Sequence, residues 1–285
     1  MRRAALGSIF LFVVVSACSL GPKQDWGDAM RDAFDRATDE GTAKVSMAVD
    51  VKVIETNIRQ TPVALIETLR GVADFREAES RLVDVNAGER RVIFDDLVTF
   101  LPRSSASIDA GTRKQRWARF DFEREPNVDL DDTDRRLAVG AGLISPVTAT
   151  EVLQGVLTGS IERVGVERVA GVRATHYTAK LSQDAAAREI DDEDRREGLL
   201  RLFDTLGVQE DVFPGEVWLD AEGLVRKVSF VLRQQKDRVN AFEMKATWEF
   251  SDYGVPVSIA LPARGDFLRS GRFREFIVEF IRAAG

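Results

Sequence analysis

Apolar residues follow two different periods at the start of the chain body. Trp26, Met30 and Ala33 recur at helical spacing, which predicts an amphipathic helix that ends before Gly41. The segment Lys44–Val53 instead alternates strictly between apolar and polar residues, which is typical of a strand with one buried and one wet face. With its flanking residues this strand is unusually long, and a sheet built on it must twist and curl.

The same alternation recurs along the rest of the chain and is interrupted by three further helical patterns. Among the predicted strands are residues 71–76, 81–86, 90–95, 98–102, 115–123, 160–167, 173–182, 215–220, 224–233, 241–251 and 257–261, and the predicted helices include 146–158, a stretch around Leu199–Leu206 and 266–284. These elements predict an α+β protein, with one large curved antiparallel sheet of about 10–11 strands and helices on its concave side.

The first residues carry the pattern of an export signal. Arg2 and Arg3 precede an apolar run, and the 14 residues of Ala4–Ala17 are fewer than the roughly 20 needed to span a bilayer. Val15–Cys18 resembles the lipobox of bacterial lipoproteins, which implies a diacylglycerol thioether on Cys18. We therefore expect residues 1–17 to be a signal peptide, residues 18–25 a tether, and residues 26–285 one domain that is lipid-anchored on the extracytoplasmic face of the cell membrane.

Composition removes several classes of function. The chain contains one Cys and one His, so neither an intramolecular disulfide nor a Cys/His zinc site is expected. Its net charge of −7 does not suit the phosphate backbone of nucleic acid. No nucleophile motif and no paired carboxylates emerge, and we assign no catalytic residue, no cofactor and no metal.

Several segments resemble one family, the LolA/LppX-like lipid carriers, and especially its actinobacterial envelope lipoproteins. The segments are Pro146–Leu157, the strand pair Val164–Tyr177, the hairpin Gly215–Arg226, and Phe250–Val257 followed by Pro262. The resemblance extends over most of residues 25–263. It implies a half-barrel that holds acyl chains of lipids or lipoglycans beneath helices.

One set of apolar residues faces the predicted concave side and its covering helix. These residues could either line a lipid pocket or pack against one another as a solid core. The members of the set are Val45, Met47, Val49, Val51, Phe94, Leu153, Leu157, Tyr177, Val228, Phe230, Phe242, Met244 and Trp248.

Two further features have alternative interpretations. His176 falls on the polar side of a predicted strand, where a locally hydrogen-bonded role is favoured over a catalytic one. The predicted helix 266–284 carries an apolar stripe with Arg269, Arg272 and Arg274 near its start, which fits docking on the sheet or contact with a membrane interface.

The sequence supports two functional hypotheses. In the first, the protein is a membrane-anchored lipoprotein that binds and shuttles lipid without catalysis. In the second, the same fold is an envelope sensor or scaffold that contacts a protein partner. A hydrolase is the weakest interpretation, because the sequence offers no catalytic constellation.

Overall fold

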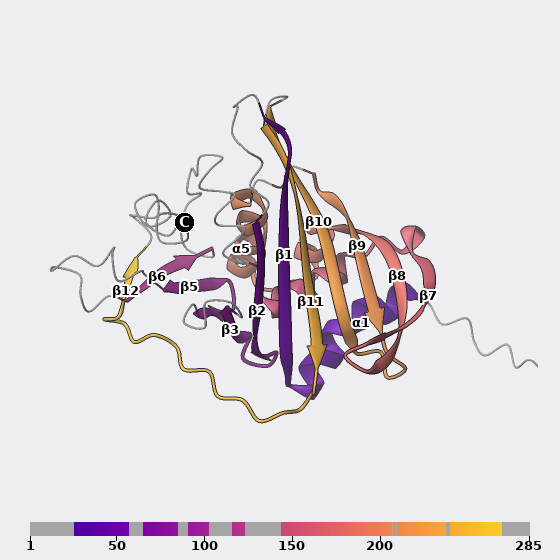
Figure 1. Ribbon diagram of the computed structural model, residues 1–285, viewed down its shortest axis with the longest axis horizontal. Coiled ribbons are helices and arrows are strands. Elements are labelled where there is room, and N and C mark those ends of the chain that lie inside the picture. The colour runs from indigo at the N-terminus through magenta and orange to yellow at the C-terminus, as the bar shows by residue number, and fades with distance from the viewer. Residues whose placement is uncertain are drawn as a thin grey trace, which may run out of the picture.

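A single twelve-stranded sheet dominates the computed structural model (Figure 1). The structure describes residues 26–56, 65–84, 91–102, 116–122, 144–206, 208, 210–237 and 240–269. The strands are β1 (Thr42–Thr56), β2 (Leu65–Asp74), β3 (Glu79–Asp84), β4 (Arg91–Asp95), β5 (Val98–Pro102), β6 (Trp117–Asp121), β7 (Glu162–Val169), β8 (Val172–Ser182), β9 (Val212–Leu219), β10 (Val225–Asp237), β11 (Asn240–Ser251) and β12 (Phe267–Arg269).

The order across the sheet is β12-β6-β5-β4-β3-β2-β1-β11-β10-β9-β8-β7, so β12 and β7 form its two edges. The first eleven strands are connected by ten antiparallel pairs. The eleventh pair is parallel and joins β12 to β6. The sheet does not close into a barrel. The predicted α+β class and the single large curved sheet are confirmed.

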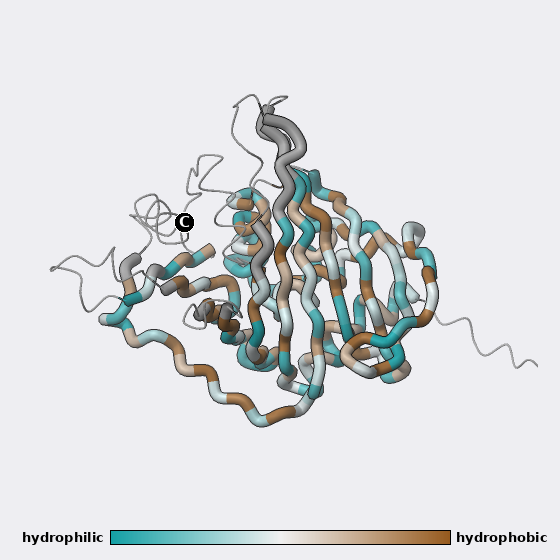
Figure 2. The backbone as a smooth tube through the Cα atoms, in the orientation of Figure 1, coloured by the Kyte–Doolittle hydropathy of each residue, from teal (hydrophilic) through white to brown (hydrophobic). Residues whose placement is uncertain are grey.

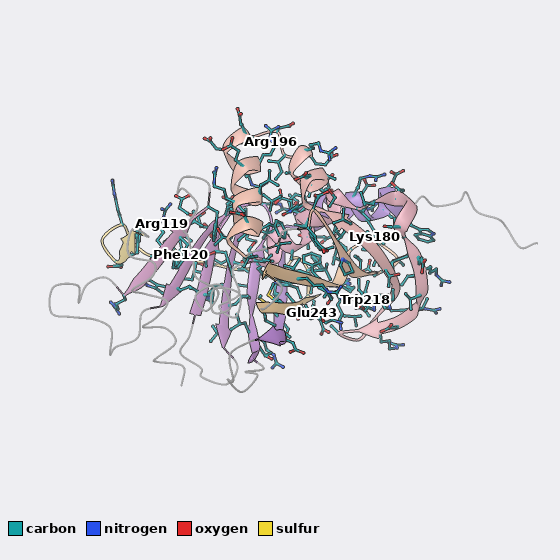
Figure 3. All side chains as sticks on the ribbon, turned by 90° about the horizontal axis from the view of Figure 1, so that it is seen from above. Arg119, Phe120, Lys180, Arg196, Trp218 and Glu243 are labelled. Carbon is teal, nitrogen blue, oxygen red and sulfur yellow. The ribbon has the colours of Figure 1, made fainter. Side chains whose placement is uncertain are left out.

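The helices lie on one side of the sheet, and the sheet curves around them (Figures 1 and 3). They are α1 (Trp26–Glu40), α3 (Pro146–Glu151), the 3₁₀ turns η2 (Val152–Gly155) and η3 (Thr158–Ser160), α4 (Gln183–Arg188) and α5 (Glu193–Thr205). We call α1, α3, η2, α4 and α5 the cover, and the side of the sheet that meets them the inner face. Alternating apolar and polar positions along the strands are visible in Figure 2.

Local signals explain where the cover helices start. The Ser145 side chain accepts a hydrogen bond from the Thr148 backbone, and Pro146 occupies the first helical position of α3. Asp192 caps α5 by accepting from the Arg195 backbone at 2.8 Å. The acidic run Asp191–Asp194 is therefore an exposed helix start, where negative charge is favourable.

The predicted helix 146–158 is too long. The α-helix ends at Glu151 and tightens into η2, after which Val156 bridges to Leu181 of β8. Gly155 allows η2 to lie close to the start of α4. A Cβ at this position would lie 2.7 Å from the Ala186 backbone nitrogen and would also collide with the carbonyl oxygen of Ser182. The turn therefore packs directly against α4.

Two predictions near the end of the described chain are wrong. Residues 257–261 are extended but form no strand within the described part of the chain. Instead of opening a helix at Asp266, the chain enters β12, where Phe267 pairs with Trp117. Both segments supply an outer apolar cluster, because Ile259 and Phe267 pack against buried residues of β4 and β5. Residues 270–285, with the rest of the predicted helix, lie outside the described residues.

Candidate functional site

Strand register gathers the predicted apolar residues into rows across the inner face. One row runs through directly paired residues of six neighbouring strands, from β2 to β8. Its members are Leu69, Met47, Trp248, Val228, Val217 and Tyr177. All six are at most 3% exposed, so the row is one continuous apolar surface beneath the cover.

Most predicted lining residues belong to this buried surface. The ten that the structure brings into one core are Val45, Met47, Val49, Phe94, Leu153, Tyr177, Val228, Phe230, Met244 and Trp248. Leu157 departs from the prediction, because it is half-buried beyond the end of η2, where its backbone donates to the Lys180 carbonyl. Val51 of β1 is paired with Met244, and Phe242 of β11 is paired with Val53. The side chains of Val51 and Phe242, like Cys18, lie outside the described residues.

An aromatic series connects the cover to the centre of the inner face. Phe203 of α5 lies 5.6 Å from Phe213 of β9, which is 5.6 Å from Phe230 of β10, and Phe230 is 5.4 Å from Trp248 of β11, measured between ring centroids. None of the four side chains is more than 2% exposed. Cover and sheet are therefore in direct apolar contact, and an acyl chain would enter between them only if they separated.

Trp248 also brings a polar atom into this apolar interface. Its indole Nε1 is buried and has no hydrogen-bond partner among the described residues. A buried donor without a partner costs about 1–3 kcal/mol. An acceptor oxygen on a bound molecule would remove that cost.

The rim of the cover is held by one ion triad, which we call the rim triad. Arg195 of α5 donates from Nη1 and Nη2 to the carboxylate of Glu151 in α3, and its Nε lies 2.9 Å from both carboxylate oxygens of Asp96 in the β4–β5 turn. The Glu151 side chain is only 2% exposed. The triad thus joins two cover helices to the sheet.

The charges of the rim triad depend on one another. Burial raises the pKa of the Glu151 carboxyl, and the hydrogen bond from Arg195 opposes that rise. Burial also disfavours the charge of Arg195, but hydrogen bonds to Glu151 and Asp96 outweigh that cost and raise its pKa. Loss of any one member would leave a poorly compensated charge in a largely buried place.

Sequence reasoning missed the rim triad. Its members are separated by 44 and 99 positions, and nothing in their local sequence marks them as partners. The one usable signal was a Glu at the end of an otherwise uncharged helix, where burial requires a counter-charge.

His176 lies on the opposite side of the sheet from the cover. Its ring stacks on Trp218 at 4.0 Å, its Nδ1 is 3.0 Å from Glu167, and its Nε2 is 3.3 Å from Glu216. The contact between Nδ1 and Glu167 is the local hydrogen bond that the sequence favoured. Within the described residues, no three His, Cys, Asp or Glu side chains are grouped as a metal site would require.

Comparisons with known proteins found similar solved structures. Among solved structures, lipoprotein LppX of Mycobacterium tuberculosis matches with a TM-score of 0.43 and 13% identity, over 84% of this chain and 100% of LppX. LprF of Mycobacterium bovis matches with a TM-score of 0.39 and 10% identity, over 85% and 99% of the two chains.

A third match is a putative outer membrane lipoprotein-sorting domain from Vibrio parahaemolyticus, with a TM-score of 0.28 and 9% identity, over 78% of this chain and 89% of that domain. All three matches are likenesses of fold at 9–13% sequence identity. No protein-family model matches the sequence, and no match was found among curated proteins. No helix in the described part of the chain is long and apolar enough to cross a membrane.

Proposed function

We propose that this protein is a lipoprotein, anchored through an acylated Cys18 to the extracytoplasmic face of the cell membrane, that binds and shuttles lipid. The ligand would be a lipid or lipoglycan whose acyl chains lie between the inner face and the cover. The protein would act by binding alone, without catalysis.

The observation that carries the proposal is the nature of the contact between cover and sheet. The contact surface is apolar along the whole row of paired residues, from Leu69 of β2 to Tyr177 of β8. The rim triad adds a polar attachment at one side. Apolar contact has no directional requirement, so an acyl chain can replace the cover against the sheet at little cost. Hydrogen bonds between strands hold the sheet together independently of the cover.

The composition of the inner face supports a ligand that is mostly hydrocarbon with a few oxygen atoms. Met47 and Met244 have flexible side chains that adapt to irregular apolar shapes. The unpaired Nε1 of Trp248 offers a hydrogen bond to an ester or hydroxyl oxygen. A lipid headgroup junction carries such oxygens.

Native mass spectrometry of the full-length chain, released gently from membranes, tests the proposal. We expect a population whose mass exceeds that of the acylated chain by one non-covalently bound lipid, and this lipid should be lost under denaturing conditions. A chain that never carries bound lipid would refute lipid binding and would favour a sensor or scaffold that contacts a protein partner. A chain without covalent acylation would refute the anchor.

A further inference from the structure

Large exposed hydrophobic side chains are concentrated at one corner of the molecule. Within the described residues, four exceed the exposure expected of a packed side chain: Trp26 at 38%, Val164 at 56%, Val166 at 38% and Leu261 at 37%. Three of the four belong to the start of α1 and to the edge strand β7. Leu261 belongs to the segment that leads to β12, at the opposite edge of the sheet.

One ring contact and the pairing of β7 with β8 place the three residues in the same part of the molecule. The Trp26 ring lies 5.1 Å from Tyr177 of β8, and Tyr177 is paired with Arg163, the residue before Val164. Val166 is paired with Thr175, two residues before Tyr177. Figure 1 shows the same arrangement, with the start of α1 beside β7 and β8. We call Trp26, Val164 and Val166 the apolar corner.

The apolar corner is close to the predicted anchor. Trp26 follows Cys18 by eight positions, a separation that spans at most about 28 Å when fully extended. A lipid attached at Cys18 therefore restricts this corner to the neighbourhood of the membrane surface. Tryptophan is favoured at that depth, where its ring is apolar and its N–H is hydrated.

The charge of the two strands at this corner also suits a membrane surface. Strands β7 and β8 carry four basic residues, Arg163, Arg168, Arg173 and Lys180, against two acidic ones, Glu162 and Glu167, although the whole chain has a net charge of −7. The first carboxylate of α1, Asp28, is paired with Arg31 at 2.6 Å. Basic residues near the surface attract anionic lipid headgroups.

The edge of β7 is poorly suited to the other common partner, a strand from a second protein. A register shift between Arg163 and Gly165 leaves Val164 in a bulge, and charged side chains flank it on both sides. Bulges and charges are the features that prevent a sheet edge from pairing with another strand. The exposed apolar residues there fit a fluid surface better than a hydrogen-bonded strand.

We propose that the apolar corner is a membrane-contact surface, which inserts into the headgroup region of the phospholipid bilayer that holds the Cys18 anchor. The proposal rests on the proposed anchor and adds an orientation to it. Trp26 covers Tyr177, the last member of the inner-face row, so this orientation directs one end of the row toward the bilayer. Lipid would then enter and leave at that end.

Site-directed spin labelling of the full-length protein tests the orientation. Acylation blocks Cys18, so a V164C variant has a single reactive thiol, and L261C is its matched control on an exposed apolar residue at the other side of the sheet. The proteins are reconstituted into vesicles of phosphatidylcholine and phosphatidylglycerol. We expect the Val164 label to lose accessibility to a water-soluble nickel relaxant and to gain accessibility to oxygen, while the Leu261 label behaves as in water.

Two failures are distinguishable. Equal nickel accessibility at both positions, in protein that floats with the vesicles, would overturn the membrane-contact surface and leave the anchor intact. A chain that does not float, and whose Cys18 accepts the label in the absence of an added cysteine, would overturn the anchor and the orientation together.

Discussion

Arg195 and Glu151 form a two-pronged ion pair that joins α5 to α3, with both guanidinium Nη atoms directed at the two carboxylate oxygens. The carboxylate is almost fully buried, whereas the guanidinium is 21% exposed and also reaches Asp96 on the sheet. This pair is one of several polar attachments of the cover, since Arg201 of α5 also donates to the Phe122 carbonyl at 2.6 Å and Arg36 of α1 to the Glu222 carbonyl at 3.1 Å. Because its carboxylate is buried, we expect this pair to be the attachment whose loss costs the most.

Replacing Arg195 should destabilise the protein strongly. R195A leaves the Glu151 carboxylate buried without its counter-charge, and such changes typically cost roughly 3–5 kcal/mol. Chemical denaturation measures the change in free energy of unfolding. The control is R196A, because Arg196 lies half-buried on the neighbouring position of α5 and points away from the sheet (Figure 3). R196A should change stability by about 0.5 kcal/mol or less, as surface substitutions usually do. Equal effects would show that the rim triad has no special role.

The same substitution should speed lipid exchange. With one attachment of the cover removed, R195A should release a fluorescent acyl lipid to acceptor vesicles faster than the wild type, because separation of cover and sheet then costs less. Stopped-flow fluorescence measures the rate, with R196A again as the control. A rate unchanged in R195A would contradict the idea that the rim triad limits the separation of cover and sheet.

The pH dependence of stability should reveal a repulsive pair on β3 and β4. Glu79 and Asp95 are directly paired across these strands. Burial raises the pKa of both carboxyls; the charge of Asp95 adds to the rise at Glu79, and that of Asp96 to the rise at Asp95. Since the folded state binds these protons more tightly than the unfolded state, the protons stabilise the fold at low pH. That stabilisation is lost as pH rises through the raised pKa values.

Neutralising Asp95 should remove the part of the pH dependence of stability that comes from its charge. At pH 7, D95N should be more stable than the wild type by up to about 1 kcal/mol, since like charges opposite one another destabilise a sheet. The difference should shrink toward pH 4. Urea denaturation across that range measures it, with D191N at an exposed site of the loop before α5 as the control. A constant difference at all pH values would contradict the assigned cause.

Gly155 should tolerate no side chain. G155A places a Cβ against the backbone of Ser182 and Ala186, so η2 and α4 must move apart, at a cost of about 1–3 kcal/mol. G159A is the matched control in the next turn, where an added Cβ meets no atom within 4 Å. Thermal unfolding of the two variants separates them. Equal melting temperatures would contradict the tight packing of η2 on α4.

The periodicity of apolar residues predicted the sheet well because strand alternation is a local property. The burial of Val45, Met47 and Val49 on one face follows directly from their spacing of two. The same logic failed at residues 257–261, whose alternation reflects half-burial of an extended segment without strand partners among the described residues. Pairing is a long-range property that alternation alone does not encode.

Contacts between distant segments explain the remaining differences. Helix 146–158 was expected to continue through Gly155, but its end is determined by α4 and β8, which follow later in the chain. The rim triad depends on three segments that come together only in the folded protein. Trp26 was correctly assigned to an apolar helix face, yet its partner Tyr177 and its exposure could be read only from the structure.

Photo-crosslinking tests the central claim most directly. The full-length protein would be incubated with a phospholipid that carries a diazirine near the end of one acyl chain, irradiated, digested and mapped by mass spectrometry. We predict crosslinks to inner-face residues of β10 and β11, including Met244 and Trp248, and to residues of α5 that face them. Crosslinks confined to the outer side of the sheet, around His176 and Trp218, or to the apolar corner alone, would contradict binding between the cover and the inner face.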